Sequence, residues 1–335
     1  MEKEIKKIKS KLHTAKNITI LCHVHPDGDA IGSALALFHY FKSRGKNVNV
    51  ISPNDFHKFL DWMPESDKIS VYSKNKNKNE IEAAITNADI IFCIDFNASD
   101  RIDELEPVYL KSKAFKILID HHIQPQKFTD ITISNTNVSS TAELIYNVII
   151  KISGSKKNIT KEIGECLYVG ILTDTGSFSY SCSYKTHLIT SELIKAGVNN
   201  NYVNQLVFSR YSEDRVRLLG YCLSEKLVVI PELNTAYFTL TREEQIKYKY
   251  RYGDTEGIVN YALAINGINL AAIIVERTGE IKFSFRSKGN FNVSKMAVNH
   301  FNGGGHNNAS GGFLKTPLNE AVEYFIKTIK KYPEI

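Results

Sequence analysis

The sequence predicts an α/β protein of two domains, with a parallel sheet in the N-terminal domain and a smaller α/β domain after it. Three observations support this fold class. The 335 residues exceed what a single core usually holds, short β-branched runs alternate with helical patterns in the first half, and a second set of strands follows near residue 223.

The first half contains four short apolar runs of the kind that parallel sheets bury on both faces. These predicted strands are 18–24, 48–51, 89–94 and 115–119. Helical patterns occupy 30–42, which Gly45 ends, and then 140–152 and 160–172. The alternation of strands and helices predicts a parallel sheet with helices on both faces.

The second half begins with a helical, more polar stretch from residue 185 to 223, and its last part (209–223) is expected to form a connecting helix. Further strands are predicted at 226–230, 236–240, 270–276 and 280–285. The expected organisation is therefore an N-terminal domain (1–209), a linker helix (210–222) and a C-terminal domain (223–335). We expect the active site in the cleft between the two domains.

Composition and charge exclude several classes of protein. The N-terminal segment carries charges throughout, which is not typical of a signal peptide, and no run approaches eighteen apolar residues, so no membrane partner is expected. Five cysteines without a CxxC pair indicate free thiols and a cytoplasmic location. The net charge of +6 suits an anionic substrate but is weak evidence for nucleic acid.

Four segments place acidic or imidazole side chains at the ends of predicted strands or of an apolar helix. The ends of parallel strands form the edge at which open α/β sheets bind ligands. The residues are His23, His25, Asp27 and Asp29 after the first strand, Asp95 after DIIFCI, Asp120, His121 and His122 after FKILI, and Asp174 in LYVGILTDTG.

Imidazoles and carboxylates without a thiolate favour a divalent ion that prefers nitrogen and oxygen ligands, above all Mn²⁺. Five carboxylates in one site would repel each other unless cations neutralised them, and two divalent ions would nearly balance their charge. Two ions about 3.5–4 Å apart can clamp the attacking and leaving oxygens of a phosphoryl displacement.

Each feature alone also has a structural explanation. An Asp at the end of a strand is more often a helix or turn cap than a ligand. Gly28 and Gly32 fit neither the dinucleotide fingerprint nor a Walker loop. The joint occurrence of all four segments, in order, favours the metal site.

These residues resemble the DHH phosphoesterase family, and the resemblance extends over essentially the whole chain. The segment 283–312, FSFRSKGNFNVSKMAVNHFNGGGHNNASGG, is similar to the signature of the DHH-associated C-terminal domain, DHHA1. Together with DTEGIVNYAL before it, the segment resembles the family's nano-RNase and pAp phosphatase branch.

The resemblance implies a role for each site residue. It implies that His23 and Asp27 bind one metal ion, that Asp29, His121 and Asp174 bind the other, and that Asp95 bridges the two. Asp120 would orient imidazoles, and His122 would face the substrate phosphate. His25 stands where many members of the family have Asn, so a substrate or hydrogen-bonding role is expected for it.

The C-terminal signature also contains residues suited to binding an anion. Consecutive glycines, including Gly304 and Gly305, let backbone N–H groups approach an anion, and His306 can donate to phosphate. Arg286 offers a bidentate fork for a second phosphate. The alternative is that the glycines form a flexible turn and Arg286 is a surface strand residue. Arg101 is a further candidate for a phosphate contact.

The activity that the resemblance implies is two-metal hydrolysis of phosphoesters in short oligoribonucleotides, releasing 5′-mononucleotides, and of 3′-phosphoadenosine 5′-phosphate (pAp) to AMP. Short single-stranded RNA and small phosphorylated nucleotides would be the substrates, with two divalent ions, Mn²⁺ being expected, as cofactors. The alternatives are a cyclic-dinucleotide or linear dinucleotide phosphodiesterase, an inorganic pyrophosphatase, an exonuclease for long single-stranded DNA, and a non-catalytic nucleotide- or RNA-binding module. The oligomeric state stays open, with a homodimer as one option.

Overall fold

The computed structural model describes residues 2–74, 78–251 and 253–332. The chain divides into two compact units, Met1–Arg210 and Tyr211–Ile335. Each unit has its own sheet and its own hydrophobic core. The two units are described in turn.

The N-terminal unit is built on a six-stranded parallel sheet with the strand order β3-β2-β1-β4-β5-β6. Its strands are β1 (Asn17–Leu21), β2 (Asn47–Ser52), β3 (Ile69–Val71), β4 (Ile90–Ile94), β5 (Phe115–Asp120) and β6 (Ile131–Ser134). Every residue of β4 is buried, which explains its continuous apolar sequence. The strand order reverses between β1 and β4, which are neighbours in the sheet.

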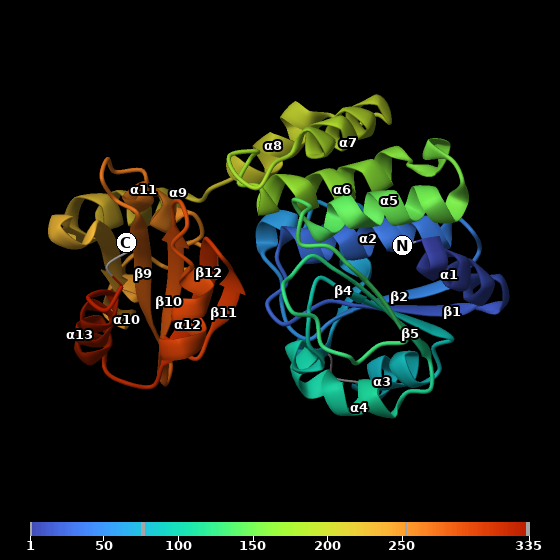
Figure 1. Cartoon of the computed structure of the whole chain (residues 1–335), viewed down its shortest axis with the longest axis horizontal. Helices are drawn as coiled ribbons and strands as arrows, with labels where there is room; N and C mark the ends of the chain where they lie inside the picture. The colour runs from blue at the N-terminus through green and yellow to red at the C-terminus, as the bar shows by residue number, and fades with distance from the viewer. Residues whose placement is uncertain (1, 75–77, 252, 333–335) are drawn as a thin grey trace. The chain divides into compact units, whose positions relative to one another are not determined.

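Helices cover both faces of this sheet, as the alternating sequence pattern predicts. Helices α1, α2, α5 and α6 pack on one face, α3 and α4 pack on the other, and α7 and α8 contact α6 (Figure 1). They are α1 (Glu2–Thr14), α2 (Gly28–Lys42), α3 (Lys78–Thr86), α4 (Glu106–Lys111), α5 (Thr141–Ser153), α6 (Lys161–Asp174), α7 (Tyr184–Lys195) and α8 (Asn200–Phe208). Short 3-10 helices are η1 (Lys58–Leu60), η2 (Ser66–Lys68), η3 (Tyr72–Lys74), η4 (Ser99–Leu105) and η5 (Lys156–Asn158).

Strand β1 ends three residues earlier than its apolar sequence predicts. After Leu21 the chain turns away from the sheet, because the backbone N–H of Val24 donates to the carbonyl of Arg101 at 2.8 Å. His25 then adopts a left-handed backbone with φ 53°, and its N–H donates to Oδ1 of Asn54 at 2.5 Å. The turn places the residues that follow β1 at the carboxyl edge of the sheet.

Glycines allow α2 and α6 to pack with their backbones in close contact. A Cβ on Gly32 would lie 2.4 Å from the carbonyl oxygen of Cys166, and one on Gly28 would lie 2.4 Å from Oγ1 of Thr173. On the facing helix, a Cβ on Gly170 would lie 2.8 Å from Oδ1 of Asp29. The spacing of Gly28 and Gly32 therefore serves helix packing and brings the end of α6 beside the start of α2.

The C-terminal unit contains a mixed sheet with the order β11-β12-β10-β9-β8-β7, in which only the β8–β9 pair is parallel among the pairings described. The strands are β7 (Leu227–Ile230), β8 (Thr235–Leu240), β9 (Leu270–Arg277), β10 (Glu280–Ser287), β11 (Gly304–His306) and β12 (Ala309–Leu314). Helices α9 and α11 pack with one hydrophobic cluster of the unit, and α12 and α13 pack with another. The helices are α9 (Glu213–Tyr221), η6 (Cys222–Lys226), η7 (Pro231–Leu233), α10 (Arg242–Lys247), α11 (Ile258–Leu263), α12 (Val293–His300) and α13 (Leu318–Ile329).

Two of the three consecutive glycines, Gly304 and Gly305, lie in a strand and not in the flexible turn that was the alternative to anion binding. The segment Gly304–His306 forms β11 and pairs with β12. A Cβ on Gly303 would lie 1.9 Å from the carbonyl oxygen of Gly311. Gly305 has φ +139°, and a Cβ there would lie 2.7 Å from the carbonyl oxygen of Ala309. Close strand packing is therefore sufficient to explain why glycine occupies these positions.

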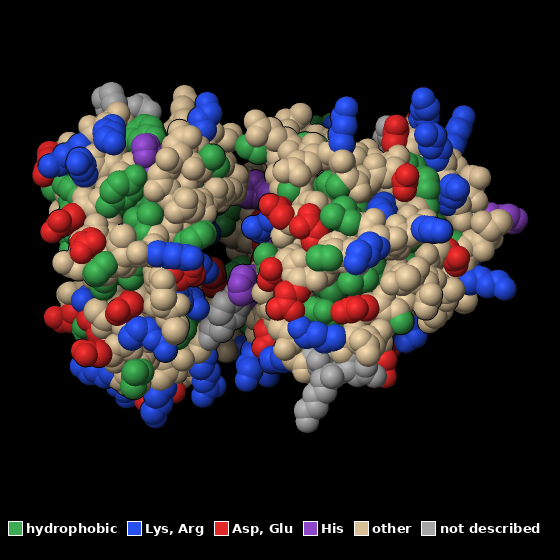
Figure 2. All heavy atoms as spheres, turned by 90° about the horizontal axis from the view of Figure 1, so that it is seen from below, with side chains coloured by type: hydrophobic (Ala, Val, Ile, Leu, Met, Phe, Trp, Pro, Cys, Tyr) green, Lys and Arg blue, Asp and Glu red, His purple; other side chains and the backbone are tan. Residues whose placement is uncertain are grey.

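The structure bears out the predicted fold class: a parallel α/β sheet followed by a smaller α/β unit. All five cysteines are free thiols. Within the described ranges of the chain, no helix is long and apolar enough to cross a membrane. On the face shown in Figure 2, lysine and arginine side chains are interspersed with aspartate and glutamate.

The contact between α2 and α6 can be tested with Gly32→Ala. The added methyl group would meet the backbone of Cys166, so we expect the substitution to destabilise the protein by about 1–3 kcal/mol. Thermal unfolding monitored by circular dichroism measures this. Gly220→Ala in α9 is the matched control, because nothing lies within 4 Å of its added Cβ, and it should be neutral or stabilising. Equal unfolding temperatures for both variants would contradict the close-packing argument.

Candidate metal centre

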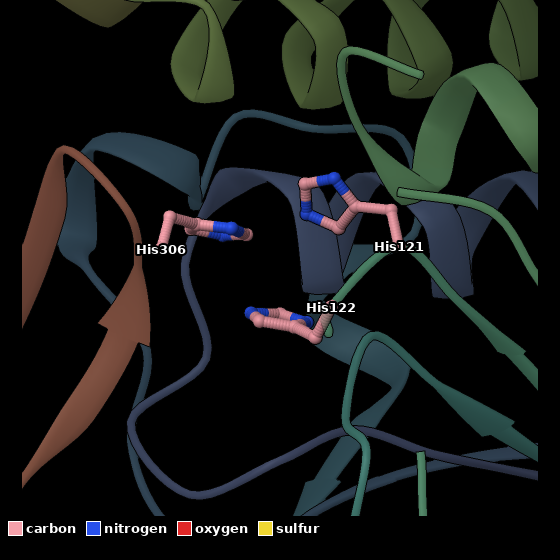
Figure 3. A group of neighbouring side chains, drawn as sticks. All are labelled: His121, His122 and His306. Carbon is pink, nitrogen blue, oxygen red and sulfur yellow. The ribbon is translucent and has the colours of Figure 1, made fainter. Parts of the chain in front are cut away.

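The candidate ligands of the N-terminal unit gather at the carboxyl edge of its sheet, where the strand order reverses between β1 and β4. Open α/β sheets bind ligands at such a switch point. His23 follows β1, Asp95 comes directly after β4, and Asp120 is the last residue of β5. His121 and His122 extend from the loop that continues β5 (Figure 3).

A first cluster consists of His23, Asp27 and Asp95, whose ligand atoms lie within 4.8 Å of one another. Nε2 of His23 lies 3.6 Å from Oδ2 of Asp95. Asp27 is also the N-cap of α2, since its Oδ1 accepts from the N–H groups of Asp29 and Ala30. Its second oxygen, Oδ2, takes no part in this cap, so capping and metal binding are compatible at Asp27.

A second cluster consists of Asp29, His121 and Asp174, whose ligand atoms also lie within 4.8 Å of one another. Nε2 of His121 lies 3.4 Å from Oδ2 of Asp174 and 3.9 Å from Oδ2 of Asp29. Asp174 is the last residue of α6. The close packing of α6 on α2 therefore brings Asp174 beside Asp29, in the first turn of α2, and His121, which follows β5.

Asp95 lies between the two clusters. Its Oδ2 faces His23 at 3.6 Å, and its Oδ1 faces Nε2 of His121 at 3.7 Å. The residue is only 2% exposed and has a left-handed backbone with φ 66°, while its N–H donates to the carbonyl of Ile119 at 3.1 Å. Left-handed residues other than glycine are uncommon and often lie at functional sites. The position of Asp95 allows one carboxylate to serve both clusters.

Asp120 contacts His122. Nδ1 of His122 lies 2.7 Å from Oδ1 of Asp120, and 3.7 Å from Oδ1 of Asp95. These three residues could also form a metal-binding group by distance alone. However, the short bond already occupies one ligand atom of Asp120 and one of His122, so we interpret the pair as a hydrogen-bonded unit beside the clusters.

The clusters fit divalent metal ions on electrostatic grounds. The pKa of Asp95 is raised well above its ordinary value, first by burial and then by the charges of Asp29, Asp27, Asp120 and Asp174. Burial, followed by the charge of Asp27, raises the pKa of Asp29 to about 7. Burial lowers the pKa of His23 to about 4, which keeps this imidazole neutral and able to bind a metal.

A buried oxygen of Asp120 also indicates a nearby positive charge. Oδ2 of Asp120 is buried and has no hydrogen-bond partner among the residues that the structure describes. Burying such an oxygen is costly unless a positive charge compensates it. A cation in the adjoining clusters would supply that charge.

The sequence did not point to Thr141, the first residue of α5. Its backbone N–H donates to Oδ2 of Asp29 at 2.6 Å, and its hydroxyl donates to Oδ1 of Asp95 at 2.7 Å. The N–H of Ala142 donates to Oδ1 of Asp29 at 2.8 Å. The signal in the sequence was the start of a helix at Ser140, but nothing there indicated which side chains the helix end would meet.

His25 and Arg101 lie near the first cluster. The side chain of His25 is exposed, and its left-handed backbone belongs to the turn after β1. Arg101 lies in η4, its carbonyl accepts from Val24, and its positive charge lowers the pKa of His23, although less than burial does. Both positions agree with a role in contacting an anionic substrate.

The remaining candidate residues lie in the C-terminal unit. Arg286 of β10 pairs with Ala309 of β12, and Ala309 pairs with His306 of β11, the third residue labelled in Figure 3. Directly opposed residues of antiparallel strands point to the same face, so Arg286 and His306 share one face of this sheet with about 10 Å between their strands. Nε of Arg286 is buried without a hydrogen-bond partner among the described residues.

The fold and the site define a two-domain α/β protein whose N-terminal sheet carries paired histidine–carboxylate clusters. Comparison with known proteins assigns residues 17–171 to the DHH family, N-terminal domain, and residues 234–334 to the DHHA1 domain. The chain therefore belongs to the DHH family and carries a DHHA1 domain, as the sequence resemblance indicated.

Relatives match over nearly the full length of the chain. An exopolyphosphatase-related protein from Bacteroides fragilis has a similar structure, with a TM-score of 0.94, 43% identity, and coverage of 99% of this chain and 97% of that chain. The bifunctional oligoribonuclease and PAP phosphatase NrnA of Thermus thermophilus is 27% identical over 94% of this chain and 89% of its own length. The protein of the same name from Bacillus subtilis is 28% identical over 87% of each chain.

A more distant structure shares the fold alone. RecJ from Thermus thermophilus, in complex with Mn²⁺, has a TM-score of 0.59 at 10% identity, and this chain covers 55% of it.

The raised pKa of Asp29 predicts that metal binding competes with protons. The raised pKa values of Asp29, about 7, and of Asp95 favour protonated carboxyl groups in the metal-free protein, whose protons a metal ion must displace, whereas the pKa of His23, about 4, leaves no proton to release from pH 6 to 8. The apparent affinity for Mn²⁺ should therefore rise with pH through about 7, by up to roughly tenfold per unit for each displaced proton. Titration calorimetry at pH 6 and pH 8, in buffers of different ionisation enthalpy, measures affinity and proton release together. Equal affinities without proton release would contradict the prediction.

Proposed function

We propose that the protein hydrolyses phosphoesters in short oligoribonucleotides, releasing 5′-mononucleotides, and converts pAp to AMP. The observation that carries this proposal is the pair of histidine–carboxylate clusters that share Asp95. The relatives named bifunctional oligoribonuclease and PAP phosphatase, which match almost end to end, support the substrate class.

Two divalent ions, Mn²⁺ by preference, are proposed as the cofactors. His23 and Asp27 would hold one ion, and Asp29, His121 and Asp174 would hold the other, with Asp95 shared between them. The donor set of imidazoles and carboxylates supports a metal that favours nitrogen and oxygen ligands. When bound, such ions lower the pKa of a coordinated water molecule and neutralise charge on a phosphoryl group.

The proposed role of His122 is to stabilise negative charge on the reacting phosphate. The carboxylate of Asp120, 2.7 Å from Nδ1, fixes the orientation of the His122 ring. In the proposed role, an N–H at Nε2 donates to a phosphoryl oxygen, where negative charge develops during hydrolysis. Arg101 would add a positive charge beside the first cluster, and His25 would form a hydrogen bond with the substrate.

Residues of the C-terminal unit are proposed to bind a second phosphate of the substrate. The buried Nε of Arg286 without a hydrogen-bond partner among the described residues supports this role, because a phosphate oxygen would satisfy it. His306 shares the face of Arg286, and the backbone of Gly304 and Gly305, on the same edge strand, is proposed as a further contact for the phosphate. A 5′-phosphorylated short oligonucleotide and pAp both present more than one phosphate, so both suit two binding groups.

Turnover of several substrates side by side tests the proposal. The purified protein with Mn²⁺ should cleave a 5′-phosphorylated diribonucleotide and pAp, with lower efficiency for RNAs beyond about five nucleotides, because added nucleotides gain few fixed contacts. Cyclic dinucleotides, pyrophosphate and polyphosphate belong in the same panel, since these substrates would identify the rival phosphoesterases.

The same substrates are also assayed with Asp95→Asn, a variant that tests the two-metal assignment. It keeps the size of the side chain and suits a left-handed backbone, but it removes the charge shared by both clusters. We expect turnover to fall by a factor of at least about a thousand while the fold is retained. Cleavage of pyrophosphate or a cyclic dinucleotide alone would overturn the substrate assignment. Full activity of Asp95→Asn would overturn the two-metal assignment.

Arg286→Ala separates substrate binding from chemistry. Loss of charge-assisted hydrogen bonds to a remote phosphate should raise KM by roughly 10- to 100-fold and leave kcat almost unchanged. Arg217→Ala in α9 is the control, because this exposed arginine pairs with Glu213 at 2.8 Å on the surface of the same unit. An unchanged KM for both pAp and the diribonucleotide would show that Arg286 does not bind substrate.

A further inference from the structure

Helix α5 contacts both candidate metal clusters through its first residue. Thr141 is fully buried, its hydroxyl donates to Oδ1 of Asp95 at 2.7 Å, and its N–H donates to Oδ2 of Asp29 at 2.6 Å. Asp29 belongs to the second cluster, and Asp95 is shared by both. Thr141 is not one of the expected ligands, but it bonds to two of the expected ligand carboxylates.

The hydroxyl of Thr141 is directed toward Asp95 because of its place in the helix. Within a helix, threonine Oγ1 commonly bonds to a carbonyl one turn earlier. Thr141 begins α5, so no helical carbonyl precedes it, and Ser140 supplies the N-cap by accepting from the N–H of Glu143 at 3.2 Å. The cap function is thus filled by Ser140, and Thr141 makes its bond outside the helix.

We propose that Thr141 is a positioning residue of the metal centre: its hydroxyl fixes the orientation of the Asp95 carboxylate, so that each oxygen faces a different cluster. The inference rests on the proposed two-metal function. Without this bond the Asp95 side chain can rotate about its last torsion, and the separate alignment of Oδ1 and Oδ2 is lost.

The effect should be larger at the second cluster. Oδ1 of Asp95, which accepts the Thr141 bond, is the oxygen that faces His121 at 3.7 Å. Oδ2 faces His23 at 3.6 Å, on the side of the first cluster. Loss of the hydroxyl therefore releases the oxygen on the side of Asp29, His121 and Asp174.

The start of α5 is held by other bonds, so the hydroxyl can be removed without freeing the helix. Oε2 of Glu143 accepts from Oγ of Ser139 at 2.8 Å and from Oγ1 of Thr186 at 2.9 Å. The backbone N–H of Ser139 donates to the same oxygen at 3.2 Å. The N–H of Thr141 stays available to Asp29 in any variant that keeps the helix.

Thr141→Val tests the proposal, because valine keeps the shape of threonine and removes the hydroxyl. Metal-free protein is titrated with Mn²⁺ by calorimetry, which counts the bound ions and measures each affinity. We expect two ions in the wild type and a loss of about 10- to 100-fold in the affinity of one of them in Thr141→Val, the range typical of groups that orient metal ligands. Thr141→Ser, which retains the hydroxyl, should restore most of the affinity.

Thr19→Val is the matched control. Thr19 is also fully buried in the N-terminal unit, but its hydroxyl donates to the carbonyl of Ala84 at 2.7 Å instead of to a candidate ligand. It should bind both ions as the wild type does. If Thr141→Val does not fold, Thr141→Ala and Thr141→Ser replace it in the same comparison, with circular dichroism to verify the fold.

The outcomes separate this inference from the proposed function. Wild-type affinity in Thr141→Val, or an equal loss in Thr19→Val, would overturn the positioning role while leaving the two-metal function intact. A wild-type protein that bound no divalent ion would overturn the proposed function and, with it, the role of Thr141.

Discussion

The repulsion among clustered carboxylates is the constraint on which the N-terminal unit depends. Asp29, Asp95 and Asp120 are each at most 2% exposed, and burial raises the pKa of Asp95 before any neighbouring charge is added. Such a group of acids is unfavourable unless cations, donated hydrogen bonds or protons compensate it. The strand order, the helix ends and the glycines can all be understood as ways of bringing these charges together and compensating them.

The sheet and the larger part of the metal centre could be predicted from the sequence because their signals are local. Runs such as IIFCI are apolar throughout, and strands buried on both faces require that pattern. Asp95 and His121 each follow such a run, and parallel strands place their carboxyl ends at one edge. For this reason the candidate metal ligands, although far apart in the sequence, could be predicted to lie together.

Other features could not be predicted from the sequence because they depend on contacts between distant segments. The bonds of Thr141 to Asp29 and Asp95 span 112 and 46 residues of sequence, and no pattern around position 141 indicates them. Gly28 and Gly32 fitted no known nucleotide loop in the sequence, whereas the structure shows that Gly32 faces the backbone of α6 and Gly28 faces the side chain of Thr173 in α6. The triple glycine suggested anion binding or a flexible turn, yet Gly304 and Gly305 lie in an edge strand, and the partner strand removes the space for a Cβ on Gly303 and Gly305.

The sequence separation of the ligands has a consequence for biosynthesis. Asp29 lies in the first turn of α2, and Asp174 ends α6, so the second cluster cannot close until the chain has been made beyond residue 174. Parallel sheets with such distant partners fold slowly. During translation Asp174 would join the acids at the sheet edge only when α6 docks on α2. A chain truncated before residue 174 would therefore lack the second cluster.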